Sequence, residues 1–448
     1  MKTHRYILIC ILYSVLCTPI WSQDFLRLTE RSLTGTARYV GMGGAMTAIG
    51  GDPSAAHDNP AALGLYRRAE VLVSFDYSYD RTRQVGADAF WTKHLFHVPQ
   101  ASLVLSFSRD KMTDEGVQFN NLLFSYKRIH SFGRNMYGVN KDGGPSLGVL
   151  LASADVNWDI PFCSARENTG YDLMLNESGH VDEFVADWSM NISNRVFVGA
   201  GIHILSYMLS STGTYKETFA GLLTDDGKPY YNENRSELIL NGAGCALSMG
   251  VIWRPLGWLR LGLGMQSPSL GSVNTFTDGE LWAQTDSLRS SYAGEVRFPS
   301  ENYRLPAHLS LSTAFQIGAY GLIALQYDFR HASYMDDVHS LRAGIEVIPV
   351  LGLYINAGYV YESTFKNREM SVGIDPTFVR QDTYFLQPRS SQYASFAIGY
   401  RGANVLVQAA YQYRLQKLNM YAHENVLEAF PMRSDTHRIV FTLGWHRN

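Results

Sequence analysis

Two groups of side chains in the sequence have the residue types that could carry chemistry. His94 and His97 form an H-x-x-H pair, a spacing that would place two imidazoles on one face of a helix as ligands for a metal ion or haem. The surrounding segment, however, has the features of an external loop and supplies no carboxylate or thiolate as a further ligand. We therefore expect a surface pair rather than a metal site, and no bound cofactor.

The second group consists of charged and imidazole side chains that should point inward from successive predicted strands. Its members are His308, Asp328, Arg330, Arg342 and Glu346. They could form a catalytic cluster, but no Ser/His/Asp arrangement stands out. Charges that line the lumen of a barrel commonly pair with one another across strands. We therefore expect lumen pairing and no enzymatic activity.

Period-two alternation of apolar and polar residues is the main structural signal of the chain. Val71 and Val73, for example, alternate with Ser74 and Asp76. The apolar face repeatedly ends in Tyr, Phe or Trp, as the interfacial girdle of a membrane barrel does. The pattern predicts strands at 69–79, 99–108, 117–130, 182–192, 195–209, 237–254, 258–267, 304–317, 320–330, 338–348, 352–362, 392–401, 404–415 and 435–446.

The connections between these strands alternate between short and long. Short links such as 193–194 and 402–404 alternate along the chain with long ones such as 131–181 and 268–303. Short periplasmic turns and long external loops are typical of outer-membrane barrels. The sequence therefore predicts an all-β fold, a 14-stranded antiparallel transmembrane β-barrel. Residues 145–155 alternate poorly, and we assign them to an external loop.

The segment 35–66 differs from the rest of the chain because it is built from Gly, Ala and small polar residues. Such a segment has too few large apolar groups for a core of its own, and too little charge for a disordered leader. We expect it to pack inside the barrel as a hatch. Gly41, Gly43 and Gly44 could suggest a phosphate-binding loop, but a dinucleotide site needs a preceding strand and a following helix, and neither is predicted.

The 448 residues carry a formal net charge of −3. This near-neutral charge gives no indication of the basic surface that binds nucleic acid. Residues 1–22 have the features of an export signal peptide, residues 23–68 form the predicted hatch, and residues 69–448 form the predicted barrel. No later segment is apolar over the 18 residues that a membrane helix needs. After cleavage two cysteines remain, Cys163 and Cys245, and the sequence leaves their pairing open.

The chain resembles the FadL/TodX family of outer-membrane transport proteins, in a branch found in Bacteroidetes-type bacteria. The matching stretches are 37–66, which contains Asn59, Pro60 and Ala61, and 181–202, 250–270 and 339–349. The resemblance implies a 14-stranded barrel in the outer membrane of a Gram-negative cell, plugged by an N-terminal hatch. It also implies that Asn59, Pro60 and Ala61 form a turn of that hatch, and we add Gly41, Gly43, Gly44 and Asp52 as hatch or gating residues.

The resemblance further implies passive uptake of hydrophobic small molecules, such as long-chain fatty acids or aromatic hydrocarbons. In the family, ligand leaves sideways into the membrane beside a kinked strand. Asn120 and Asn121 in the third strand are candidates for such a kink, or they simply begin a lumen-facing strand. We expect a monomer in contact with outer-membrane lipid. The alternative function is a non-transporting barrel that acts as a docking protein of a surface or export assembly.

Overall fold

The computed structural model describes residues 27–108, 115–146, 167–284, 289–297, 300–333, 336–363, 385–421 and 429–446. The predicted signal peptide, Cys163 and most of the segment 145–155 lie outside these residues. None of the helices found in the described residues is long and apolar enough to cross a membrane.

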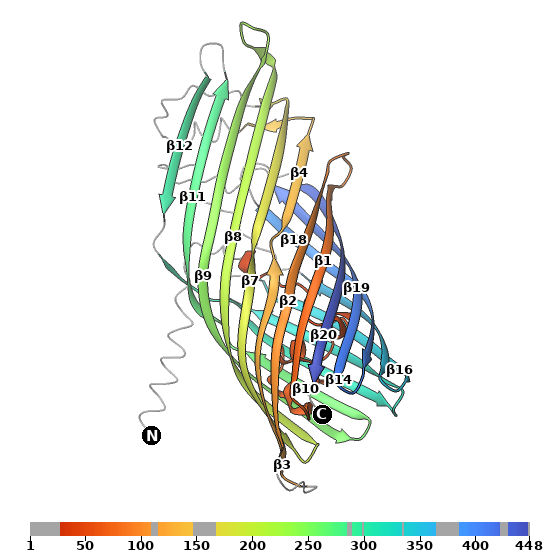
Figure 1. Cartoon of the computed structure of the whole chain (residues 1–448). Coiled ribbons are helices and arrows are strands. Elements are labelled where there is room, and N and C mark those ends of the chain that lie inside the picture. The colour runs from red at the N-terminus through yellow and green to blue at the C-terminus, as the bar shows by residue number, and fades with distance from the viewer. Residues whose placement is uncertain are drawn as a thin grey trace, which may run out of the picture.

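Fourteen long strands in the described residues close into an antiparallel barrel (Figure 1). Each strand pairs with the next along the chain, and β1 pairs with β20 to close the cylinder. The strands are β1 (Glu70–Gln84), β2 (Phe90–Ser108), β3 (Val117–Ser131), β7 (Gly170–Ile192), β8 (Val196–Leu223), β9 (Pro229–Leu256), β10 (Leu259–Gln266), β14 (Ala307–Ile317), β15 (Gly321–His331), β16 (Val338–Val350), β17 (Leu353–Ser363), β18 (Phe385–Arg401), β19 (Val405–Tyr421) and β20 (Phe430–His446). The predicted number and order of strands are confirmed.

The predicted strand bounds are too short at the end of the barrel that carries the long connections. β8 continues to Leu223 and β9 begins at Pro229, although residues 210–236 are predicted to form a loop. β4 (Arg134–Asn140) extends the line of β3 along β7, while β11 (Leu270–Gln284) pairs with β9, β12 (Arg289–Arg297) and β13 (Glu301–Tyr303). A short ladder joins β5 (Gly144–Pro145) to β6 (Glu167–Asn168). Backbone pairing therefore continues beyond the apolar part of the wall.

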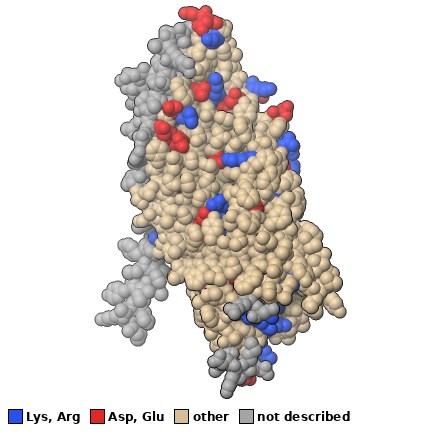
Figure 2. All heavy atoms as spheres, in the orientation of Figure 1, with Lys and Arg blue, Asp and Glu red and all other residues tan. Residues whose placement is uncertain are grey.

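The outer face of the barrel is apolar over a broad band. Side chains that alternate outward are exposed and large, among them Phe96, Leu247, Met249 and Leu341. Figure 2 shows many of the charged side chains towards the end with the long hairpins, and a broad band of the wall with few of them. Outward-facing tyrosines bond to histidines on the neighbouring strand, with Oη to Nδ1 distances of 2.6–2.7 Å; the pairs are Tyr77–His94, Tyr327–His339 and Tyr411–His437. They form part of the aromatic girdle that the sequence predicted.

The H-x-x-H pair lies on β2 and not in a loop, which corrects the sequence interpretation. Side chains three residues apart on a strand point to opposite faces. His94 accordingly faces outward to Tyr77, whereas Nδ1 of His97 lies 3.4 Å from the buried carboxylate of Asp76. The two imidazoles therefore share no ligand position.

The described part of the N-terminal segment, residues 27–68, lies inside the barrel, in the half nearer the tight turns (Figure 1). It contains four short helices, η1 (Arg27–Thr29), α3 (Ala37–Gly41), α4 (Pro53–Ala56) and η2 (Pro60–Leu65). Nearly all of its residues are buried, and its small side chains contact the inner wall. The predicted hatch is thus confirmed as an internal plug.

Candidate functional site

The hatch is held in shape by polar side chains that cap its short helices. The Asp52 carboxylate caps α4 by accepting from the Ser54 N–H at 2.8 Å, and it also accepts the Thr36 hydroxyl at 2.7 Å. Thr36 in turn caps α3 and accepts from the Tyr39 N–H at 3.2 Å. Side-chain caps satisfy backbone donors that a helix start leaves unpaired. Asp52 therefore joins the starts of two helices.

The Asn59-Pro60-Ala61 turn performs the same task for η2. Oδ1 of Asn59 accepts from the Ala61 N–H at 3.0 Å, and its Nδ2 donates to the Thr47 carbonyl at 3.0 Å. Pro60 begins η2, where the missing N–H costs no hydrogen bond. Asn59 is fully buried. Its side-chain oxygen lies so close to Gly250 of β9 that a Cβ added there would collide with it. This turn therefore fits the wall as tightly as it fits the hatch.

The predicted glycines of the hatch lie where its backbone touches the wall. Gly43 and Gly44 have φ values of +62° and +72°, which L side chains rarely adopt. A Cβ at Gly358 of β17 would collide with the backbone of Met42 and Gly43, and a Cβ at Gly41 would collide with Ala397. Glycine on both sides of this contact lets two backbones approach closely.

Ion pairs anchor one side of the hatch to strand β16. Arg38 donates to both carboxylate oxygens of Glu346 at 2.7 and 2.9 Å. On β16, Arg342 lies 2.6 Å from Asp328 and 3.4 Å from the hatch residue Asp58. Burial raises the pKa of Asp58, but the Arg342 guanidinium outweighs this effect and lowers the pKa below its ordinary value. The carboxylate therefore stays charged and attached.

The five predicted lumen charges all point inward and pair, as expected. Besides the pairs formed by Arg342 and Glu346, His308 lies 3.5 Å from Asp328, and Arg330 lies 2.9 Å from Glu362. Asp328 and its partners lie on neighbouring strands, Glu362 lies two strands away from Arg330, and the partner of Glu346 belongs to the hatch. The prediction of lumen pairing is confirmed for these residues.

Asn120 and Asn121 pair in register with both neighbouring strands, and the register shifts of β3 lie elsewhere, at Val117/Phe119 and at Arg128/His130. Asn120 is exposed on the outer face. Asn121 is buried and donates through Nδ2 to the carbonyls of Leu63 and Tyr66, at 2.6 and 3.1 Å. Asn121 thus attaches the end of the hatch to the wall.

The interruption of the third strand lies eleven residues further on, at Phe132 and Gly133, between β3 and β4. The ladder between β2 and β3 runs from Ser108–Phe119 to Gln100–Lys127. Beyond it, in the described parts of these strands, residues 90–97 of β2 pair with β1 alone. We call this unpaired boundary between 90–97 and 128–140 the wall seam.

Side chains, and not a backbone ladder, close the wall seam. Leu95 packs against Gly133, where an added Cβ would collide with its side chain. Lys93 donates to the Asn135 side chain at 3.2 Å, and Oγ of Ser131 lies 3.3 Å from Nε2 of His97. No sheet hydrogen bonds between β2 and β4 hold this boundary in the described parts of the two strands. The break in alternation at residues 131–134, which read S-F-G-R, is the sequence signal for the wall seam. The predicted strand ends just before it, at residue 130.

The lumen between the hatch and the long hairpins contains an apolar cluster, which lies beside buried charged side chains such as Arg134 and Glu177. Buried side chains of β3, β7, β8 and β9 meet Leu28 of η1 in one cluster, whose members include Phe132, Val181, Leu205, Leu209 and Leu240. Closer to the open end, the ring of Tyr171 packs on those of Tyr215 and Phe430. Tyr171 and Phe430 also line a pocket of about 650 Å³ between the β1–β2 tip, β4 and the start of β20. Phe132 belongs to the apolar cluster and directly precedes Gly133 at the wall seam.

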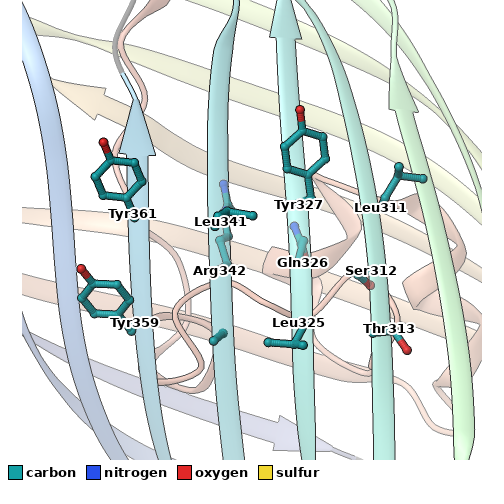
Figure 3. Close-up of a pocket in the computed structure, with 11 residues that line it drawn as sticks. Leu311, Ser312, Thr313, Leu325, Gln326, Tyr327, Leu341, Arg342, Tyr359 and Tyr361 are labelled. Carbon is teal, nitrogen blue, oxygen red and sulfur yellow. The ribbon is translucent and has the colours of Figure 1, made fainter.

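A second pocket, of about 800 Å³, lies on the outer face of β14–β17 (Figure 3). Leu311, Leu325, Leu341 and three tyrosines surround it, and the backbone ladders of these strands are unbroken there. It is therefore a groove in the wall and not a window.

Comparisons with known proteins support the fold. No protein-family model matches the sequence, and no curated protein matches it. Among solved structures, a Pseudomonas aeruginosa FadL homologue superposes with a TM-score of 0.54 at 13% identity, over 93% of this chain and 98% of that one. The P. putida toluene transporter TodX gives 0.52 at 14% identity, and the Ralstonia pickettii toluene transporter TbuX gives 0.53 at 12%; each comparison covers 93% of this chain and 99% of the other. The chain has the FadL-type fold. The likeness spans nearly the whole of each chain.

Proposed function

We propose that the protein is an outer-membrane channel for passive uptake of hydrophobic small molecules, namely long-chain fatty acids or aromatic hydrocarbons. The observation that carries the proposal is the apolar section of the lumen, which lies between a plugged end and a wall seam that only side chains close. Its structural neighbours include two toluene transporters. The outward apolar band and the aromatic girdle support a position in the membrane.

The path of the ligand runs from the pocket near the long hairpins, whose lining is part polar and part apolar, to the apolar cluster. An apolar molecule is captured in the pocket beside Tyr171 and Phe430 and moves into the cluster around Phe132 and Leu205. The hatch blocks the direct route, since its polar face is bonded to the wall on several sides. Displacement of Leu95 from Gly133 then gives lateral release into the membrane. Small movements of the hatch accompany this step.

No step of this path needs bond making, so we propose transport and not catalysis. Each barrel has its own hatch and wall seam, and we expect it to act as a monomer surrounded by outer-membrane lipid. The alternative of a docking barrel would suit a wall without a seam, and the seam therefore favours transport.

The test is uptake of labelled oleate and labelled toluene by Gram-negative cells that lack their own channels for them and express the full chain. We expect faster uptake of one or both than in cells with an empty vector. Equal uptake of both compounds, with the barrel present and folded in the outer membrane, would overturn the proposal.

A further inference from the structure

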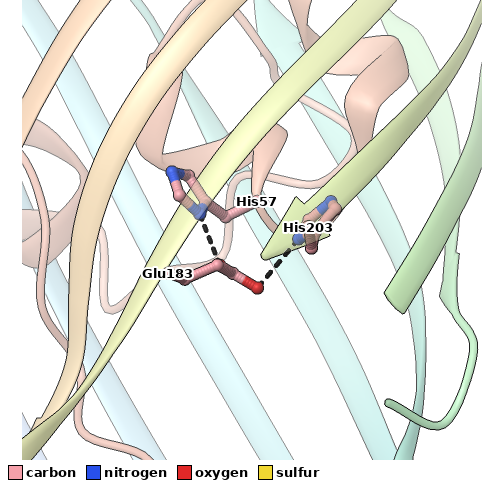
Figure 4. Close-up of side chains that lie close together, drawn as sticks. All are labelled: His57, Glu183 and His203. Carbon is pink, nitrogen blue, oxygen red and sulfur yellow. Dashed lines mark hydrogen bonds and ion pairs between the residues drawn. The ribbon is translucent and has the colours of Figure 1, made fainter. Parts of the chain in front are cut away.

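Three side chains of the kinds that bind metal ions meet where the hatch touches strands β7 and β8. They are His57 at the end of α4, Glu183 on β7 and His203 on β8 (Figure 4). Their nearest donor atoms all lie within 4.8 Å of one another, and each side chain is almost completely buried. None of the hatch anchors described above includes these residues.

The carboxylate of Glu183 lies between the two imidazoles. Its Oε2 is 2.5 Å from Nδ1 of His57, and its Oε1 is 2.8 Å from Nδ1 of His203. Both imidazoles therefore present the same ring nitrogen to a common point. Two imidazole nitrogens and one carboxylate oxygen are a donor set that divalent transition ions, Zn²⁺ in particular, bind in proteins.

The outer nitrogen of each imidazole is also held. Nε2 of His57 lies 3.1 Å from the Ser125 hydroxyl, and Nε2 of His203 lies 2.7 Å from the Ser248 hydroxyl. Such contacts fix the orientation and tautomer of a ligating histidine. Gln266 donates to Oε1 of Glu183 at 3.3 Å and orients the carboxylate.

Asp187 provides an independent observation that points to a ligand. Its side chain is fully buried, and neither carboxylate oxygen has a hydrogen-bond partner. Its Oδ1 lies 3.6 Å from Nε2 of His203. A buried carboxylate behind a histidine is the usual outer partner of a metal-bound imidazole, and a nearby cation would offset the cost of burying its charge.

We propose that His57, Glu183 and His203 form a binding site for one divalent transition metal ion, with Asp187 as the outer partner of His203. Bonds of 2.0–2.1 Å in a tetrahedral site separate the ligand atoms by about 3.3 Å. The distances from Nδ1 of His57 and Nδ1 of His203 to the carboxylate oxygens of Glu183 are 2.5 and 2.8 Å. Each must therefore widen by less than about 1 Å on binding. A fourth position is left for water.

The site joins the hatch to the wall, since His57 belongs to the hatch and the other two ligands belong to the barrel. A bound ion would therefore act as a cross-link that holds the plug in place. This inference does not depend on which molecule, if any, passes through the lumen.

The test measures Zn²⁺ bound to the full barrel in detergent after dialysis against a chelator, by calorimetry and by metal analysis. We expect one ion per barrel in the wild type. Glu183→Gln and His203→Asn should each abolish stoichiometric binding, and Asp187→Asn should lower the affinity about 10–100-fold. His94→Asn is the matched control, because this outward imidazole should contribute nothing.

Folding of each variant is checked by its heat-dependent migration on a gel, so that a loss of binding is read only from intact barrels. Absence of stoichiometric Zn²⁺ in the wild type would overturn the proposal. Equal affinity of folded Glu183→Gln and wild type would also overturn it. Co²⁺ gives a second readout, since its visible absorption should be intense in the wild type and weak in folded His203→Asn.

Discussion

Replacement of Asn121 by alanine tests whether the hatch is held by its attachment to the wall. The change removes two hydrogen bonds, from Nδ2 to the carbonyls of Leu63 and Tyr66 at 2.6 and 3.1 Å. Each such bond contributes about 0.5–1.5 kcal/mol, so the attached state should lose about 2 kcal/mol. Because 1.4 kcal/mol corresponds to a factor of ten, the population of the displaced hatch should rise about thirtyfold.

The assay is single-channel recording of the purified barrel in a planar bilayer. Asn121→Ala should open about thirtyfold more often than the wild type, with an unchanged conductance per opening. Asn120→Ala is the matched control, because the Asn120 side chain is exposed on the outer face of the barrel, whereas the hatch lies inside it. An opening frequency of Asn121→Ala equal to that of Asn120→Ala would refute the reasoning.

Three further predictions test the hatch and the wall seam. Deletion of residues 27–68 should turn the barrel into an open pore, measured as a large steady ion conductance, and an unchanged conductance would contradict the role of the hatch. Burial raises the pKa of Glu30, yet the Arg27 and Arg134 guanidiniums lower it from 4.5 to about 2. The lowered pKa of Glu30 stabilises the folded state by about 3 kcal/mol at pH values above 4.5. This stabilisation is lost as the pH falls towards 2. Urea unfolding should therefore show Glu30→Gln less stable than wild type at pH 7 but equally stable near pH 2, and equal stability at pH 7 would count against it. Gly133→Leu should fill the wall seam and reduce ligand uptake without changing ion conductance. Gly221→Leu is the control and should have no effect, because an added Cβ meets no atom there. Equal uptake by both variants would exclude release at the seam.

The sequence predicted the barrel because lipid outside and polar groups inside place opposite side-chain types on alternate residues. That contrast fades where strands pass beyond the apolar band. In β8 the outward Thr212, Thr214 and Lys216 no longer differ from the inward polar residues, yet backbone pairing continues to Leu223. Hydrogen bonding between strands needs no hydrophobic pattern, and so the sequence could not show where the hairpins end.

Local chemistry of the hatch was predictable, whereas its contacts with the wall were not. Asp52 and Asn59 each precede a proline and cap a helix, a role that follows from neighbouring residues. The His57–Glu183 contact joins positions 126 residues apart. It depends on barrel register and on the placement of the hatch, which no local spacing encodes. A wall kink was predicted at Asn120 and Asn121 of the third strand, where the ladders to both neighbouring strands are in register.

The most direct test of the central claim is native mass spectrometry of the full chain extracted gently in detergent, combined with organic extraction of whatever remains bound. An apolar lumen section closed by a hatch should retain a stoichiometric hydrophobic small molecule, such as a fatty acid or an aromatic hydrocarbon. An empty barrel that instead retains a protein partner would contradict transport and support a docking role.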